Sequence, residues 1–313
     1  MLNKTVRIIN QILNYFGIQL IRIPQKTYDT ADIWSNWICH SPVKFGEIYR
    51  KNREIQKLVS TWLTNEVYEN SLWNYGIIKN QSMDSLNSIE KNITYTDLLV
   101  FFSMFLNKIT YLEIGVSAGK NFFQVSKHLE NSSIWGLDIE EINPILEQFY
   151  SNKKTIWESD NFFDFKSKHG LKVKKKFTLN EYLEDKNQNK IYYLSGDKFE
   201  NKLWERLKGE KFNLIFSDAF HTPNSIKTEM DFLIKYDLIN KNNFIMIWDD
   251  INPNNPDMVT SLLSIGEKLN KIFSNNQTFF SLFKIHGTFS GDINGFHNMG
   301  IFISDSNIFS FKN

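Results

Sequence analysis

The stretch Tyr111–Phe123, which reads YLEIGVSAGKNFF, constrains the fold of this chain more than any other. Mostly apolar residues from 109 to 114 predict a strand that is buried on both faces. Gly115 and Gly119 then allow a sharp turn and a close approach of the backbone to a neighbour. Apolar residues continue at helical spacing after Gly119. The stretch therefore predicts a strand, a glycine turn and a helix N-terminus, whose free N–H groups suit a polar or anionic ligand.

The spacing of the two glycines limits the kind of ligand. A dinucleotide-binding loop has the pattern GxGxxG, which requires glycines at positions 117 and 120 when counted from Gly115. Those positions hold Ser117 and Lys120, so the pattern fails. An ordinary strand–helix turn without a ligand is the alternative that the loop alone leaves open.

Strands and helices alternate after this stretch, which predicts a parallel sheet with helices on both faces. Further strands are expected over residues 134–138, 191–194, 212–216 and 244–248, and a closing pair over 279–285 and 299–303. Ligands of an open parallel sheet bind beyond the carboxyl ends of its strands. Acids lie at or near that end of five successive predicted strands. They are Glu113, Asp138, Asp197, Asp218 and the pair Asp249 and Asp250.

The chemistry of these acids gives each a candidate role. The two oxygens of a carboxylate match a diol, so Asp138 is suited to the two hydroxyls of a ribose. Glu113 is suited either to orienting the glycine loop or to bracing it. Asp218, Asp249 and Asp250 would repel one another unless a cation lay between them, and oxygen ligands favour a hard ion such as Mg²⁺. His221 has the right side chain for a general base, with a helix-capping or core histidine as the alternative.

Three short motifs carry a resemblance to a known family. The pattern Glu113-x-Gly115-x-x-x-Gly119 resembles motif I of class I S-adenosylmethionine-dependent methyltransferases. Asp218-Ala-Phe-His221 and Asp249-Asp250 resemble motifs of divalent-metal-dependent O-methyltransferases, of the catechol and caffeoyl-coenzyme A type and of the antibiotic-sugar type that includes macrocin O-methyltransferase. The resemblance covers residues 94–305. It implies a Rossmann-like, doubly wound α/β fold with a seven-stranded sheet and a C-terminal antiparallel strand pair.

The resemblance also implies a site. It implies His221 and Asp218 as catalytic residues, and Asp218, Asp249 and Asp250 as ligands of Mg²⁺ or another divalent cation. The cofactor would be S-adenosylmethionine, bound by Glu113, Gly115, Val116, Ser117, Gly119, Asn121, Phe122, Asp138, Ile139, Gly196, Asp197 and Asp218. Histidine rather than lysine at position 221 favours a sugar or other polyol as methyl acceptor over a catechol.

Two other functions remain open on the same fold. A cephalosporin-hydroxylase-like group shares related motifs but catalyses a different reaction. A methyltransferase-like module without turnover is the non-enzymatic alternative, although intact Asp218, His221, Asp249 and Asp250 argue against it.

Composition limits the partners. The chain has 313 residues with 36 basic and 35 acidic side chains, and a net charge of +1 does not indicate a nucleic-acid surface. One cysteine, Cys39, rules out an internal disulfide and a cysteine-based zinc cluster. No apolar run approaches the ~20 residues of a membrane span, and no signal peptide is evident, so we expect a cytoplasmic protein.

The chain divides into two predicted regions. Residues 1–93 are expected to be helical and rich in aromatic side chains, and to cover the acceptor site or form a contact in a homo-oligomer. Residues 1–24 pattern as an amphipathic helix, which packs on protein or lies on a membrane surface. Residues 94–313 are the predicted methyltransferase domain. Its second and third strands are separated by an insertion at 141–190, expected to be a lid or extra helices.

Overall fold

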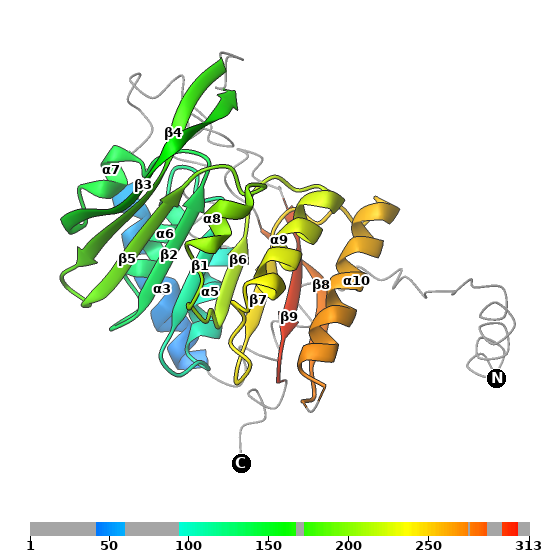
Figure 1. The fold of residues 1–313 in the computed structure, drawn as a ribbon. Coiled ribbons are helices and arrows are strands. Elements are labelled where there is room, and N and C mark those ends of the chain that lie inside the picture. Colours follow the sequence, from blue (N-terminus) through cyan, green and yellow to red (C-terminus); the bar gives the residue numbers. More distant parts are fainter. Residues whose placement is uncertain (1–41, 60–93, 167–171, 275, 287–295, 306–313) are drawn as a thin grey trace, which may run out of the picture.

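The structure is a computed structural model that describes residues 42–59, 94–166, 172–274, 276–286 and 296–305. These residues form one nine-stranded sheet in the order β3-β4-β5-β2-β1-β6-β7-β9-β8 (Figure 1). Its parallel part consists of β5 (Asn189–Ser195), β2 (Ser133–Asp138), β1 (Thr110–Ile114), β6 (Leu214–Ser217) and β7 (Ile245–Trp248). The antiparallel pair β8 (Phe279–His286) and β9 (Phe296–Ile303) continues the sheet beyond β7. The predicted Rossmann-like α/β fold with a closing antiparallel pair is therefore confirmed, and the sheet is two strands longer than the predicted seven.

Helices cover both faces of the sheet and enclose two separate cores. One core lies under α3 (Pro42–Val59), α5 (Tyr95–Ser103) and α6 (Lys120–Ser126), and the other under α8 (Asn201–Glu205), α9 (Pro223–Lys235) and α10 (Pro256–Ile272). Side chains of β1 alternate between them, since Tyr111 belongs to the first core and Leu112 to the second. A strand that is buried on both faces explains the nearly continuous apolar run in the sequence.

The helix before β1 begins two residues earlier than its sequence indicates. We expect Thr96 to be the N-cap from the sequence, but Thr94 occupies that position in the structure. The Asp97 carboxylate accepts a hydrogen bond of 2.8 Å from the Thr94 backbone N–H and pairs with Arg53 of α3 at 2.7 Å. Asp97 therefore fixes the start of α5 and joins it to α3.

The insertion at 141–190 forms strands, not the predicted lid or helices. After the short helix α7 (Pro144–Glu147), β3 (Ser151–Lys166) and β4 (Lys172–Glu184) form an antiparallel hairpin. β4 pairs with β5, so the hairpin extends the sheet at its edge (Figure 1). Most described side chains of β3 are exposed. The sequence of β3 therefore lacks the apolar run by which a buried strand is recognised.

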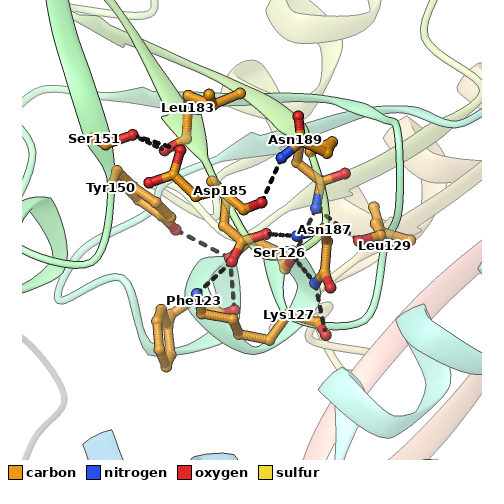
Figure 2. A network of polar contacts seen from close by, with 12 residues as sticks. Phe123, Ser126, Lys127, Leu129, Tyr150, Ser151, Leu183, Asp185, Asn187 and Asn189 are labelled. Carbon is orange, nitrogen blue, oxygen red and sulfur yellow. Dashed lines mark hydrogen bonds and ion pairs between the residues drawn. The ribbon is translucent and has the colours of Figure 1, made fainter.

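The turn after this hairpin supports the C-terminal end of α6 (Figure 2). The side-chain amide of Asn189 donates to the carbonyls of Ser126 at 2.9 Å and Leu129 at 2.6 Å. The side-chain amide of Asn187 donates to the carbonyl of Lys127 at 3.1 Å. Helix C-termini leave carbonyls without partners, and these two asparagines satisfy them. The insertion is thus part of the support of the helix that starts at the glycine loop.

Within the predicted helical region 1–93, the structure describes α3 alone. This helix begins at Pro42, in agreement with the preference for proline in a first turn. The apolar residues at helical spacing that predict a helix in the sequence start only nine residues later, at Lys51. Residues 1–41 and 60–93 lie outside the described residues, so the proposed N-terminal cover or oligomer contact stays a prediction. In the described part of the chain, no helix has the length and apolar character needed to cross a membrane.

Candidate active site

The glycine loop between β1 and α6 has three residues with positive φ. Gly115, Ser117 and Gly119 have φ angles of 89°, 51° and 83°. Position 115 also requires glycine because another loop approaches it closely. A Cβ there would lie 2.6 Å from the backbone N and Cα of Ala219. The loop after β1 therefore packs directly on the loop after β6. Ser117 adopts the left-handed conformation without being glycine, which costs about 1 kcal/mol and often marks a functional loop.

Gly119 is required for a different contact. A Cβ at this position would lie 2.4 Å from Cδ2 of Leu146, which belongs to α7 of the insertion. The insertion therefore also packs against the start of α6.

Asp138, at the end of β2, holds the glycine loop. Its Oδ2 accepts a hydrogen bond of 2.8 Å from the Ser117 N–H, and its Oδ1 accepts one of 2.8 Å from the Glu140 N–H. The Val116 backbone N–H is a third donor to this carboxylate, whose two oxygens offer about four acceptor positions, so one remains for a ligand hydroxyl. Burial raises the pKa of Asp138, and the hydrogen bonds from Glu140 and Ser117 oppose that rise.

Glu113 lies inside a buried polar network below the loop. Its Oε2 accepts hydrogen bonds from the Tyr111 hydroxyl at 2.7 Å and from the Asn121 side-chain amide at 2.9 Å. Asn121 also accepts a hydrogen bond of 2.7 Å from the Thr96 hydroxyl, so the network connects β1, α5 and α6. Burial raises the pKa of Glu113 well above its ordinary value. This arrangement gives Glu113 and Asn121 a bracing role beneath the loop.

This raised pKa predicts a pH-dependent loss of stability. The unfolded Glu113 ionises above about pH 4.5, whereas the folded side chain keeps its proton to higher pH, so its contribution is full at acid pH and is lost as pH rises toward the folded pKa. The variant Glu113→Gln has no proton to lose. We expect it to gain about 1.4 kcal/mol of unfolding free energy relative to the parent for each pH unit in that window.

Urea denaturation of parent and variant between pH 4.5 and 8 measures this difference. The exposed Glu54, changed to Gln, is the matched control because its carboxyl is in water. A parent–variant difference that stays constant across the pH range would rule out a buried, protonated Glu113.

Asp218 and His221 form an acid–base pair after β6. The Nε2 of His221 lies 3.4 Å from Oδ1 of Asp218, with 22% of the His221 and 28% of the Asp218 side chain exposed. Burial and the nearby charge of Asp249 raise the pKa of Asp218. Burial opposes a charged imidazole, but the hydrogen bond that His221 donates to Asp218 and the charges of Asp218, Asp249 and Asp250 outweigh it and raise the pKa of His221. The pair is thus partly accessible and able to exchange protons.

The three predicted metal ligands do not form a metal site in the structure. Among the described residues, no group of three His, Cys, Asp or Glu side chains is arranged to hold a metal ion. Asp249 is buried, and its Oδ1 accepts a hydrogen bond of 2.8 Å from the backbone of Asp250. Asp250 is exposed and has a left-handed φ of 50°. Metal binding by these carboxylates therefore stays a prediction, and we derive no chemical step through a cation.

The remaining predicted cofactor residues lie around the same edge of the sheet. Val116 and Phe122 are buried in the first core, and Ile139 is half-buried after β2. The Gly196 N–H donates a hydrogen bond of 2.7 Å to the carbonyl of Asp138, which joins the loops after β5 and β2. Asp197 is half-buried, and its Oδ1 accepts a hydrogen bond of 2.9 Å from the Phe199 N–H. The structure thus brings the loops after β1, β2, β5 and β6 together.

Two polar residues near the site carry no signal in the sequence. Lys198 follows Asp197 and is buried, and its partner Glu229 lies on α9. Their separation of 31 residues hides the pair from any local pattern.

Comparison with known proteins gives weak similarities of structure. No protein-family model and no curated protein sequence matches the chain. Similar solved structures include the O-methyltransferase TomG from Streptomyces achromogenes in complex with SAM (12% identity, 79% of this chain, 98% of that chain, TM-score 0.43). An O-methyltransferase from Bacillus cereus in complex with SAH has 13% identity, 78% and 99% coverage and a TM-score of 0.43. Precorrin-6y C5,15-methyltransferase from Geobacter metallireducens has 10% identity, 69% and 92% coverage and a TM-score of 0.37.

Proposed function

We propose that this chain transfers a methyl group from S-adenosylmethionine to a hydroxyl of a sugar or other polyol. The observation that carries the proposal is the contact between the two loops. The glycine loop at Gly115 packs against the backbone of Ala219, next to the pair formed by Asp218 and His221. A loop suited to a cofactor and a pair suited to proton transfer therefore share one edge of the sheet.

The residues at this edge fit the proposed cofactor. The loop from Gly115 to Gly119, with a glycine at each end, brings backbone to the end of β1, and Asp138 retains a free acceptor position beside it. Asp197 is available for the adenine end. When bound, S-adenosylmethionine supplies an electrophilic methyl group on a sulfonium.

The chain's own residues supply the acid–base chemistry. His221 in its neutral form, with the N–H at Nε2 facing Asp218, accepts the proton of the acceptor hydroxyl at Nδ1 as the oxygen attacks the methyl carbon. Asp218 orients the imidazole through its Oδ1 and stabilises the positive charge that the imidazole gains. The resulting imidazolium then passes its proton to water.

Cofactor binding is the most direct test. We expect Asp138→Ala to weaken the binding of S-adenosylhomocysteine by about 1–3 kcal/mol in calorimetry, because hydroxyl groups of the ligand lose their acceptor and the Ser117 N–H loses its partner. Asp231→Ala is the control, since Asp231 is exposed on α9. Equal affinity of Asp138→Ala and the parent for S-adenosylhomocysteine would show that the cofactor does not bind at this loop.

Two further measurements separate the finer parts of the proposal. Methyl transfer to a panel of glycosides and polyols distinguishes an enzyme from a module that binds cofactor without turnover. Metal assistance, which the sequence predicts, is tested by assay after treatment with EDTA. Lost turnover that Mg²⁺ restores, with unchanged S-adenosylhomocysteine affinity, would support it, and unchanged turnover would contradict it.

A further inference from the structure

A buried ion pair lies beneath the loop that carries Asp218 and His221. The Nζ of Lys198 lies 2.5 Å from Oε1 of Glu229, and their side chains are only 8% and 1% exposed. Lys198 follows β5, and Glu229 lies in the middle of α9. The pair therefore joins two segments on either side of the candidate acid–base pair.

Glu229 connects both ends of this loop. Its Oε2 accepts a hydrogen bond of 2.6 Å from the hydroxyl of Ser217, the residue directly before Asp218. Its Oε1 is 3.4 Å from the hydroxyl of Ser225, in the first turn of α9. One carboxylate thus ties the end of β6 to the start of α9.

Lys198 holds the middle of the same loop. Its Nζ donates a hydrogen bond of 3.3 Å to the carbonyl of Phe220, the residue directly before His221. That carbonyl also accepts a hydrogen bond of 3.2 Å from the Thr222 N–H. The backbone of Lys198 is itself fixed, because its carbonyl accepts a hydrogen bond of 2.7 Å from the indole of Trp204.

Stability alone does not account for such a pair. The desolvation of two buried charges commonly cancels their attraction, and apolar residues of the same size would serve the core equally well. Only a charged group on a long side chain reaches from β5 to the Phe220 carbonyl while Glu229 compensates its charge. The ion pair therefore serves to fix the position of the Phe220 carbonyl more than to stabilise the fold.

We propose that Lys198 is a positioning residue, which holds the Phe220 carbonyl and thereby places Asp218 and His221 against the glycine loop. This inference rests on the proposed function for its kinetic consequence, although its structural consequence is independent of the reaction. Displacement of a reacting group by about 1 Å can cost up to a hundredfold in rate.

The test removes the tether without leaving a buried charge. In the full-length double variant Lys198→Met with Glu229→Gln, the Gln oxygen can accept a hydrogen bond from one of the hydroxyls of Ser217 and Ser225, and its amide N–H can donate one to the other. We expect kcat to fall by roughly 10–100-fold while S-adenosylhomocysteine affinity changes by less than about threefold. We also expect amide hydrogen exchange at Thr222 to accelerate by about tenfold or more. Lys198→Arg keeps a charged donor and should recover part of the lost rate.

The control is a second lysine–glutamate pair far from the loop. Lys127 and Glu184 lie 2.7 Å apart, and changing them to Met and Gln should leave exchange at Thr222 unchanged. Parental kcat and parental exchange in the Lys198 double variant would overturn the proposal. If that variant does not fold, Lys198→Met alone decides, with faster Thr222 exchange expected because the donor to the Phe220 carbonyl is gone. Accelerated exchange in a protein that methylates no acceptor would leave the positioning role intact and refute the proposed function instead.

Discussion

Replacement of His221 by Gln is expected to slow methyl transfer by roughly 10²–10⁴-fold, the usual contribution of a general base. Glutamine retains a polar side chain beside Asp218 but cannot accept the proton of a hydroxyl. The affinity for S-adenosylhomocysteine should stay near that of the parent, because the glycine loop and Asp138 belong to other segments. Steady-state kinetics with a responsive acceptor, together with calorimetry, give both quantities.

His128→Gln is the matched control for this prediction. His128 lies at the end of α6, where its Nε2 is 2.7 Å from Oδ1 of Asn52, and a Gln side chain can keep a hydrogen bond there. We expect this variant to retain turnover. A parental kcat of the His221→Gln enzyme would show that His221 has a structural role and that another group accepts the proton.

Replacement of Gly115 by Ala is expected to lower the free energy of unfolding by about 3 kcal/mol or more. The added Cβ would lie 2.6 Å from three backbone atoms, of Ala219 and Asp218, which cannot rotate away as a side chain can. The left-handed φ of 89° adds a penalty of about 1 kcal/mol for any L-residue. Because the two loops would separate, methyl transfer should fall together with stability. Urea denaturation and an activity assay measure the two effects.

Gly209→Ala separates the two contributions. Gly209 has a φ of 103°, but a Cβ at this position would meet nothing within 4 Å. The free energy of unfolding of this variant should fall by only about 1 kcal/mol, which is the cost of the left-handed backbone conformation alone. Equal losses in the two variants would show that close packing of the loops contributes nothing.

The glycine loop itself could be predicted, but the reason for its first glycine could not. The sequence indicates that backbone approaches something at Gly115, and a bound cofactor is the expected neighbour. The structure places the backbone of Ala219 there, more than 100 positions along the chain. Local spacing shows that a glycine is needed, whereas only the folded arrangement shows what lies against it.

The pair of Asp218 and His221 was predictable because it is local. Both residues lie on the short loop after β6, three positions apart, and Nε2 of His221 lies 3.4 Å from Oδ1 of Asp218. The metal triad stays a prediction, since it assumes that acids at neighbouring strand ends converge on one cation. In the structure, one side-chain oxygen of Asp249 accepts a hydrogen bond from the Asp250 N–H, and Asp250 is exposed. Proximity of strand ends does not determine where the side chains that follow them point.

The hairpin in the insertion escaped prediction for a related reason. Edge strands keep much of their surface in water and carry charged residues that discourage pairing with other chains. Lysines and asparagines in β3 and β4 therefore resemble a polar loop in sequence. Burial produces the patterns by which sequences are read, and the edge strand β3 has little of it.

The two supports of α6 have a consequence for protein engineering. Leu146 packs at the start of this helix, and Asn187 and Asn189 satisfy its last carbonyls, yet all three belong to residues 141–190. The segment is therefore not a removable module. A minimised scaffold that joined β2 directly to β5 would need a new apolar side chain at one end of α6 and new amide donors at the other. Libraries intended to change acceptor preference would do better to vary other loops and to leave this segment intact.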